Sequence, residues 1–306
     1  MENFNILEAI KSMARNAIRL TLLAGDGVPV GRFGGHPLVP DGFIWPTFLI
    51  DPDNKELKPR PLSFLAQFDC ESLAPMDREH LLPKSGILSF FYELCSQSWG
   101  FSPEDAGSAR VFYFPEKSAL TEMDFPADLE ENYRLPPVEF FAKTEIQYPD
   151  FEDFCCKFPG FSIFNQQEEN SEEYNKFCKE YNQAIKTLRG EDNEFRHQLL
   201  GWPSIIDNSM PFECEMVGRG YDLGSTLRAG GGYYMDAALK DVPTEILHKT
   251  EQDALDNWLL LFQLESDEFA DHHLDFSYCG NIYFYIRKTD LAGCLFDGAW
   301  LICQCY

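Results

Sequence analysis

A pattern of three β-strands occurs twice in this sequence, and this repeat constrains the fold more than any other feature. The first copy reads FLAQFD, GILSFFY and ARVFYF, and the second reads LLFQLESD, GNIYFYI and AWLICQCY. In each copy a glutamine precedes the glycine that opens the second strand, by 19 residues from Gln67 to Gly86 and by 17 from Gln263 to Gly280. The segments GGHPLV at 34–39 and LGWPSI at 200–205 also resemble each other. Repetition of this kind indicates a duplicated structural unit.

The repeat predicts the fold class and the division of the chain. We expect an α+β protein built mainly from antiparallel sheets, in which two related β-rich units pack about a pseudo-twofold axis. The units cover about 30–115 and 196–306 of a single domain that spans residues 1–306. Residues 116–195 are expected to form an irregular and helical connection, because prolines at 126, 136, 137, 149 and 159 interrupt regular elements. The alternative is that two β meanders resemble each other without a duplication.

Two helices are expected beside the strands. Residues 3–20 bring apolar side chains to one face at helical spacing, namely Leu7, Ile10, Ala14, Ala17 and Ile18. A second helix near 171–188, inserted in the second unit, has apolar residues at every third or fourth position, and Ser171 precedes it as an N-cap.

The charge of the chain restricts its partners. Fifty acidic residues against 25 basic ones give a formal net charge of −25. A field of this sign repels phosphate backbones and anionic lipid surfaces, so binding to nucleic acid or to a membrane is disfavoured. It favours association with a basic protein or a cationic ligand. The alternative interpretation is that the charge serves solubility alone.

The cysteines and the N-terminus indicate the compartment. The ten cysteines include no C-x-x-C pair, and most lie in apolar runs where a free thiol packs as a small hydrophobic group. The first 20 residues have alternating charges without the apolar core of a signal peptide, and no stretch of 18 apolar residues is present. We therefore expect a cytoplasmic protein.

No catalytic or cofactor motif is recognisable. Gly34-Gly35 lacks the lysine and hydroxyl residue of a phosphate-binding loop, and no helix with apolar periodicity is expected at the distance after 230–232 that a dinucleotide site requires. The nucleophile motif G-x-S-x-G is absent as well. Enzymatic activity is therefore unsupported, and we expect neither a catalytic residue nor a cofactor.

One cluster of acidic residues and histidines could suit a metal ion, namely Asp267, Asp271, His272, His273 and Asp275. Its spacing matches no standard metal site, and adjacent histidines point apart on a helix or a strand. A solvated acidic loop is the favoured interpretation, so no metal ligand is assigned.

The two glutamines of the repeat are the first candidates for a site. Gln67 and Gln263 each interrupt an apolar strand, and a buried amide must find hydrogen-bond partners. In the structural interpretation each amide binds a backbone group and pins the units together. In the functional interpretation both line a cleft between the units, together with Arg32, Trp45 and Arg110, and bind a small anionic ligand.

The chain resembles the YwqG-like family, a bacterial family whose defining domain, DUF1963, has no assigned function. The matching pieces run in order through nearly the whole chain: RFGGHPLVPDGFIWP at 32–46, PLSFLAQFD at 61–69, GILSFFY at 86–92, WGF at 99–101, HQLLGWP at 197–203 and the final WLICQCY. The resemblance implies the fold but no activity, cofactor or catalytic residue. The chain departs from the family at 276–280, where FSYCG stands in place of a W-G-D-x-G turn. Tyr278 occupies the position at which the family has an acidic residue.

Two functions follow as hypotheses. The first is a non-enzymatic module that binds a basic protein through its acidic surface, with an immunity-like, neutralising role beside bacterial toxins as one form of it. The second is a protein or enzyme that binds a small anionic ligand in the cleft between the units.

Overall fold

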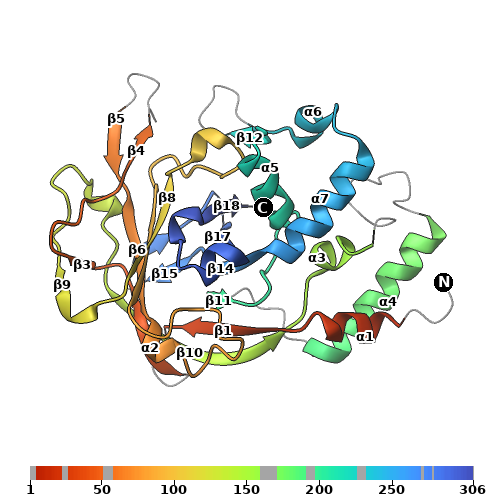
Figure 1. Ribbon diagram of the computed structural model, residues 1–306, viewed down its shortest axis with the longest axis horizontal. Coiled ribbons are helices and arrows are strands. Elements are labelled where there is room, and N and C mark those ends of the chain that lie inside the picture. The colour runs from red at the N-terminus through yellow and green to blue at the C-terminus, as the bar shows by residue number, and fades with distance from the viewer. Residues whose placement is uncertain are drawn as a thin grey trace.

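Ten strands form one antiparallel sheet (Figure 1). In chain order they are β1 (Arg15–Thr21), β2 (Val28–Phe33), β6 (Ser63–Asp69), β7 (Ile87–Tyr92), β8 (Ala109–Phe114), β10 (Val138–Gln147), β11 (Gln198–Leu200), β14 (Trp258–Glu265), β17 (Asn281–Arg287) and β18 (Trp300–Gln304). They pair in the order β18-β17-β14-β11-β1-β10-β2-β6-β7-β8. This computed structural model describes residues 5–22, 27–50, 58–158, 171–190, 197–225, 232–269, 272–277 and 279–305.

The sheet curls until its edge strands, β8 and β18, almost meet, and the segment 99–101 lies against β18. The backbone N–H of Cys303 donates to the carbonyl of Trp99 over 2.9 Å, and Trp300 Nε1 donates to the carbonyl of Gly100 over 2.7 Å. Gly100 is required here because its φ is +82° and because a Cβ atom would overlap the carbonyl of Leu301. The fold is therefore a mixed α+β fold with a nearly closed, barrel-like sheet.

Aromatic side chains fill the inside of this sheet. Phe68 on β6 lies 5.6 Å from Phe140 on β10 and 5.3 Å from Phe262 on β14, measured between ring centroids. Phe90 on β7 lies 4.8 Å from Phe262 and 5.1 Å from Phe284 on β17. Strands that are far apart in the sheet order thus meet through their side chains, and the tilted and edge-on rings stabilise the closed shape.

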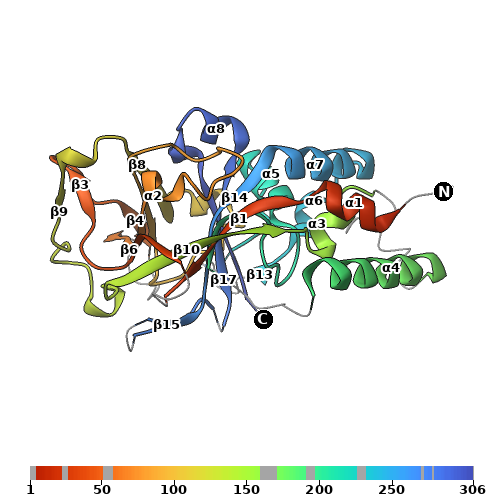
Figure 2. The same cartoon turned by 90° about the horizontal axis from the view of Figure 1, so that it is seen from below.

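The longer helices gather at one end of the barrel (Figure 2). Phe154, Phe177 and Tyr181 form one apolar cluster with the N-terminal helix. A second group packs against the outer face of β14, β17 and β18 through residues such as Trp258 and Tyr283. The helices of the first cluster are α1 (Ile6–Ser12), α3 (Phe151–Cys155) and α4 (Glu172–Arg189), and those of the second group are α5 (Met210–Gly218), α6 (Met235–Leu239) and α7 (Thr244–Asn257).

Short helices, strand pairs and turns lie around the rest of the sheet. They comprise the helices α2 (Cys70–Leu73) and α8 (Lys288–Ala292), the strand pairs β3 (Leu38–Pro40) with β9 (Leu120–Glu122), β4 (Thr47–Ile50) with β5 (Lys58–Pro61), β12 (Gly224–Ser225) with β13 (Gly232–Tyr233) and β15 (Asp267–Phe269) with β16 (His272–Leu274), and the 3₁₀ turns η2 (Pro103–Asp105), η3 (Lys117–Ala119), η4 (Glu131–Tyr133) and η7 (Phe296–Gly298). Within the described parts of the chain, no helix has the length and apolar character needed to cross a lipid bilayer.

Several expectations from the sequence are confirmed. The three strands of each copy are present as β6, β7 and β8 and as β14, β17 and β18. The inserted helix is α4, and its cap is the expected one, because the hydroxyl of Ser171 accepts a hydrogen bond of 3.0 Å from the N–H of Tyr174. The α+β class and the antiparallel sheet are confirmed with them.

The expected helix over 3–20 is wrong in its second half. Helix α1 ends at Ser12 and residues 15–21 form β1, while residues 3 and 4 lie outside the described residues. β1 pairs with β10 on one side and β11 on the other, and Ala17 and Ile18 are fully buried there. Pairing on both edges satisfies the backbone groups of this segment and overrides its helical periodicity.

The expected irregular connection over 116–195 is also wrong in part. It contains β10, a strand of ten residues that lies at the centre of the sheet. Pro137 and Pro149 lie just outside its two ends, so they delimit the strand instead of interrupting it.

Candidate functional site

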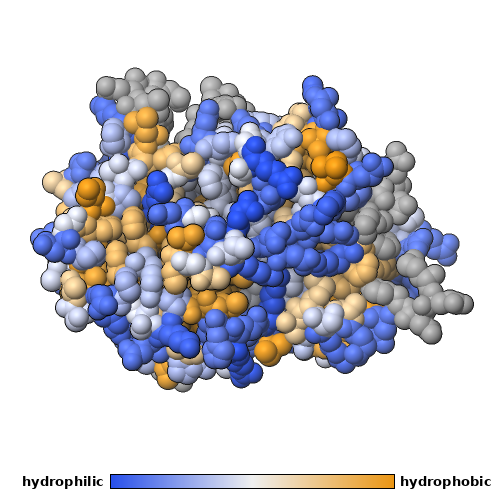
Figure 3. Space-filling view, in the orientation of Figure 1, coloured by the Kyte–Doolittle hydropathy of each residue, from blue (hydrophilic) through white to orange (hydrophobic). Residues whose placement is uncertain are grey.

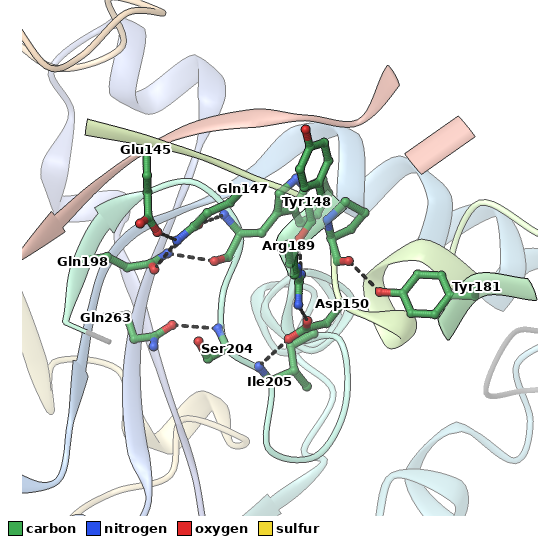
Figure 4. Close-up of polar contacts among 12 residues, drawn as sticks. Glu145, Gln147, Tyr148, Asp150, Tyr181, Arg189, Gln198, Ser204, Ile205 and Gln263 are labelled. Atoms are coloured by element: carbon green, nitrogen blue, oxygen red, sulfur yellow. Dashed lines mark hydrogen bonds and ion pairs between the residues drawn. The ribbon is translucent and has the colours of Figure 1, made fainter. Parts of the chain in front are cut away.

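A groove of about 530 Å³ lies where the barrel meets the helical end of the molecule (Figure 4). Its walls are residues 145–148 and 150–152, which follow β10 into α3, the last turns of α4 and the loop 202–205. It combines polar groups with partly exposed apolar ones such as Ile146, which is 47% exposed. We call this the β10–α4 groove.

Three glutamines support the loop 202–205 beside this groove: Gln147, which is partly buried and lines the groove, and the buried Gln198 and Gln263. The Gln147 amide donates to Glu145 Oε1 over 2.6 Å and to Gln198 Oε1 over 2.8 Å, and its oxygen accepts from the N–H of Trp202 over 3.0 Å. Gln263, the cross-strand partner of Gln198, accepts a 3.0 Å hydrogen bond from the N–H of Ser204. These side-chain amides thus hold the loop 202–205 from several sides.

The loop needs this support because its backbone is strained. Leu200 and Gly201 have φ values of +59° and +77°, and a left-handed conformation is unfavourable for leucine. Gln198 Nε2 donates to the carbonyl of Leu200 over 3.0 Å and to that of Trp202 over 2.7 Å. Strain of this kind costs on the order of 1–3 kcal/mol and persists only where neighbouring contacts fix it.

Trp202, one of the residues that line the groove, is fixed in place. Its indole N–H donates to the carbonyl of Met13 over 2.7 Å, and the Arg15 guanidinium lies 3.5 Å from the centre of its ring system. This cation–π contact ties β1 to the loop.

A carboxylate and a guanidinium meet in the groove. Arg189, the last residue of α4, donates through Nη1 to Asp150 Oδ1 over 2.7 Å and through Nη2 to the carbonyl of Tyr148. The other oxygen of Asp150 accepts from the N–H of Ile205 over 3.1 Å. The Tyr181 hydroxyl donates to the carbonyl of Pro149 over 2.7 Å. The polar edge of the groove is therefore ordered by its own contacts.

The groove carries negative charge. Among its described lining residues, the carboxylates are Glu145, Asp150 and Glu152 and the cation is Arg189. Burial raises the pKa of Glu152, and repulsion by Asp150 adds to this rise. The described lining contains neither histidine nor cysteine, the usual groups for proton transfer or nucleophilic attack near neutral pH. The arrangement is suited to binding a cationic group.

Gln67 and Arg32 lie together on the outer face of the sheet, away from this groove. They are cross-strand partners on β6 and β2 and line a shallow cavity of about 620 Å³. Gln67 accepts from the N–H of Leu38 over 3.0 Å and donates to the Leu38 carbonyl over 2.7 Å. Arg32 Nη1 contacts Glu122 Oε1 at 3.4 Å, whereas its Nη2 is buried without a hydrogen-bond partner among the described residues.

The structure does not bring the other predicted site residues to that cavity. Trp45 is buried and donates to the carbonyl of Leu62 over 2.8 Å. Arg110 is exposed on β8 and lines a small cavity next to Gly107. Gln263 lies on β14, and four strands separate β14 from β6 in the sheet order. Only Arg32 and Gln67 of the five line a common cavity there.

Sequence reasoning missed Gln147, Asp150, Arg189 and Gln198. Gln147 and Asp150 lie in the proline-rich connection that was expected to be irregular. A signal was present for Gln198, which stands in the segment HQLLGWP among apolar residues, as Gln67 and Gln263 do.

The acid–histidine cluster has a different composition from the expected one. Asp267 Oδ2 lies 3.2 Å from Nε2 of the buried His197, and His197 Nδ1 accepts from the N–H of Glu265 over 3.2 Å. The imidazole also lowers the pKa of Asp267. Because both ring nitrogens are engaged, a metal ion would have to displace one of these contacts. His273 lies on β16 and contacts Glu268, whereas Asp271 and Tyr278 lie outside the described residues.

Fold and groove together define an α+β protein with a barrel-like sheet and an acidic groove at one end. A family model described as "Domain of unknown function (DUF1963)" matches residues 31–305. The chain therefore belongs to this uncharacterised family, as the resemblance in its motifs predicts. None of the curated proteins compared with the chain matches it.

Proposed function

We propose that this protein is a non-enzymatic binding module that captures a basic protein, and that a basic segment of this partner binds in the β10–α4 groove. The observation that carries the proposal is the groove's excess of carboxylates on a chain with a net charge of −25. Complementary charge accelerates encounter and disfavours wrong partners. An immunity-like role, in which the module neutralises a basic partner, is one form of this function.

The distribution of charge offers a competing docking face. Hydrophilic residues cover α7 on the face drawn in Figure 3. Exposed acids of this helix include Glu245, Asp253 and Asp256. Since many acidic proteins attract cations without a dedicated site, the test must separate the groove from this general effect.

A matched pair of variants makes this separation. The groove variant carries Glu145→Gln, Asp150→Asn and Glu152→Gln, and the control carries three equivalent changes at Glu245, Asp253 and Asp256, so both lose three negative charges. The probe is a fluorescent peptide of alternating arginine and alanine, titrated at low and moderate ionic strength. We expect the groove variant to lose about tenfold in affinity or more, with a much smaller loss in the control. Equal losses would contradict the proposal.

A second candidate function rests on the cavity at Arg32. The Nη2 atom of Arg32, which has no hydrogen-bond partner in the described part of the chain, and the nearby Lys117 could hold a small anionic ligand, with the Gln67 amide beside them. Lys117 already pairs with Asp69 at 2.7 Å, and Glu139 also lines the cavity, so the cavity has no excess of positive charge. This candidate therefore ranks below the first.

A thermal-shift series with phosphate, citrate and a nucleoside monophosphate tests the second candidate. We expect a stabilising shift that Arg32→Ala abolishes and that Arg110→Ala, which removes an exposed arginine elsewhere, leaves unchanged. The absence of a shift for every anion, or an equal loss in both variants, would rule this candidate out.

We also propose that the sheet consists of two related units joined about a pseudo-twofold axis. Each half of the strand order, read from its edge to the centre, follows one scheme: β8-β7-β6-β2-β10 and β18-β17-β14-β11-β1. The ladders of β6 and β14 shift register next to Leu65 and Leu261, two residues before Gln67 and Gln263. These correspondences support a duplication.

Further backbone contacts support the same relationship. The N–H of Cys70 donates to the Gly86 carbonyl over 3.0 Å, and the N–H of Ser266 donates to the Gly280 carbonyl over 3.1 Å. Structures of further family members test the duplication. We expect every member to have both glutamine contacts, one in each half of the sheet. Members that keep all ten strands but have only one of the two contacts would contradict the duplication.

The cytoplasm is the compartment that we propose for this module. All ten cysteines are free thiols, among them Cys155 and Cys156, whose pKa values burial raises. Thiols of this kind are typical of a reducing compartment. Fractionation of cells that produce the protein, followed by immunodetection, tests this point.

A further inference from the structure

The contacts of Arg189 resemble those that an incoming arginine would make. Its guanidinium bridges a carboxylate and a carbonyl that lie two residues apart, Asp150 and Tyr148. A planar guanidinium can meet two such acceptors at once, whereas an ammonium group is a compact point charge. The groove thus contains a guanidinium site that is filled from within the chain.

This site is built by contacts that do not involve Arg189. The N–H of Ile205 holds the second oxygen of Asp150, and the Tyr181 hydroxyl holds the carbonyl of Pro149, the residue between the two acceptors. Asp150 is only 23% exposed. The acceptors therefore keep their orientation when the Arg189 side chain is removed.

The Arg189 side chain can leave this site because of its position on α4. It is the last residue of α4, next to the C-cap Gly190, and its side chain is 26% exposed. Its stem has several rotatable bonds, so the guanidinium can turn to solvent without moving the helix. Because it is tethered beside its acceptors, it competes with any free cation at a high effective concentration.

We infer that Arg189 is an internal placeholder in an arginine-binding pocket, and that the residue of the basic partner that enters this pocket is an arginine. This inference rests on the proposed function of the groove. Because Arg189 occupies the pocket, an incoming cation must displace it, which lowers the affinity for isolated cations. A partner that makes further contacts along the groove can offset this cost and is therefore selected.

The direct test uses N-acetyl-arginine amide as the probe and compares the wild type with Arg189→Met, which keeps much of the apolar stem. We expect the variant to bind the probe about tenfold more tightly or better, because the competing group is absent. Adding Asp150→Asn should abolish this gain. Lys179→Met, which removes an exposed lysine of the same helix, is the control and should behave like the wild type.

Specificity and folding are measured in the same experiment. N-acetyl-lysine amide should gain much less than the arginine probe, and equal gains would overturn the inference. If Arg189→Met does not fold, as judged by circular dichroism, Arg189→Gln replaces it, and failure of both variants to fold would also overturn the inference, since Arg189 would then be a structural residue.

The outcomes separate this inference from the proposed function. Capture of the arginine–alanine peptide by the groove, without a gain in Arg189→Met, contradicts only the placeholder role. A gain in Arg189→Met, with no groove-dependent capture by the wild type, contradicts the proposed function and leaves the arginine pocket as a property of the variant alone.

Discussion

Gln67 and Gln263 make the same contact in two places: each side-chain oxygen accepts a 3.0 Å hydrogen bond from the backbone N–H of a residue that directly follows a proline, Leu38 in one case and Ser204 in the other. Both glutamines are buried, with 4% and 0% of their surface exposed. The contacts fix two proline-containing segments against the barrel: the start of β3, and the loop 202–205, which is a wall of the β10–α4 groove.

Replacement of either amide by leucine should therefore destabilise the fold. Gln67→Leu and Gln263→Leu each leave a backbone N–H without its partner, which costs about 1–3 kcal/mol of unfolding free energy. Urea denaturation followed by tryptophan fluorescence measures this. Gln183→Leu, on the exposed face of α4, serves as the control and should change little. Wild-type stability in Gln67→Leu or Gln263→Leu would mean that the buried amides do not hold the loops.

Closure of the barrel predicts unequal effects of two glycine substitutions. Gly42 and Gly100 both have positive φ, but a Cβ at Gly42 meets nothing within 4 Å, whereas one at Gly100 overlaps the Leu301 carbonyl. Gly42→Ala should cost about 1–2 kcal/mol for its backbone conformation alone. Gly100→Ala should cost clearly more, because the contact between segment 99–101 and β18 must open. Equal losses in thermal or urea denaturation would contradict this account of closure.

The buried Glu213 predicts that stability falls as pH rises. Burial raises its pKa from 4.5 to about 8, and its carboxyl group accepts a 2.7 Å hydrogen bond from Tyr233. At pH values between the two pKa values, the folded protein keeps a proton on Glu213 that the unfolded chain has already released. The stability that this group contributes is therefore fully present below its pKa in the unfolded chain, and it is lost as pH rises through its pKa in the folded protein. Between about pH 5 and pH 8 the unfolding free energy should fall by an amount on the order of a few kcal/mol.

The variant Glu213→Gln isolates this effect. Its neutral amide cannot titrate, so its unfolding free energy should vary less over the same pH range than that of the wild type. Asp153, whose pKa burial raises to about 7, contributes a similar but separate dependence that remains in the variant. Identical pH profiles for the variant and the wild type would show that Glu213 is not protonated in the folded protein.

The strands that carry strong apolar patterns could be predicted from the sequence, and the strands at the centre of the sheet could not. β6, β7, β14 and β17 are rich in apolar residues because both of their faces are buried. β1 has helical spacing of its apolar residues and becomes a strand only because β10 and β11 pair with it. Tertiary pairing of this kind is not encoded in local periodicity.

The candidate site was predictable only in part, for a related reason. Gln263 was found because it interrupts an apolar strand. Asp150 and Arg189 are ordinary surface residue types whose meeting depends on the path of the chain between β10 and α4, over 39 positions of sequence. No motif records such a pair, so its identification required the structure.

The most direct measurement of the central claim is an NMR titration of the protein, labelled at isoleucine methyl groups, with the arginine–alanine peptide. Ile146 and Ile185 line the β10–α4 groove, and Ile246 is 50% exposed on the acidic helix α7. We predict that the methyl signals of Ile146 and Ile185 shift in a saturable manner while that of Ile246 stays in place. Shifts at Ile246 without shifts at Ile146 and Ile185 would contradict the account.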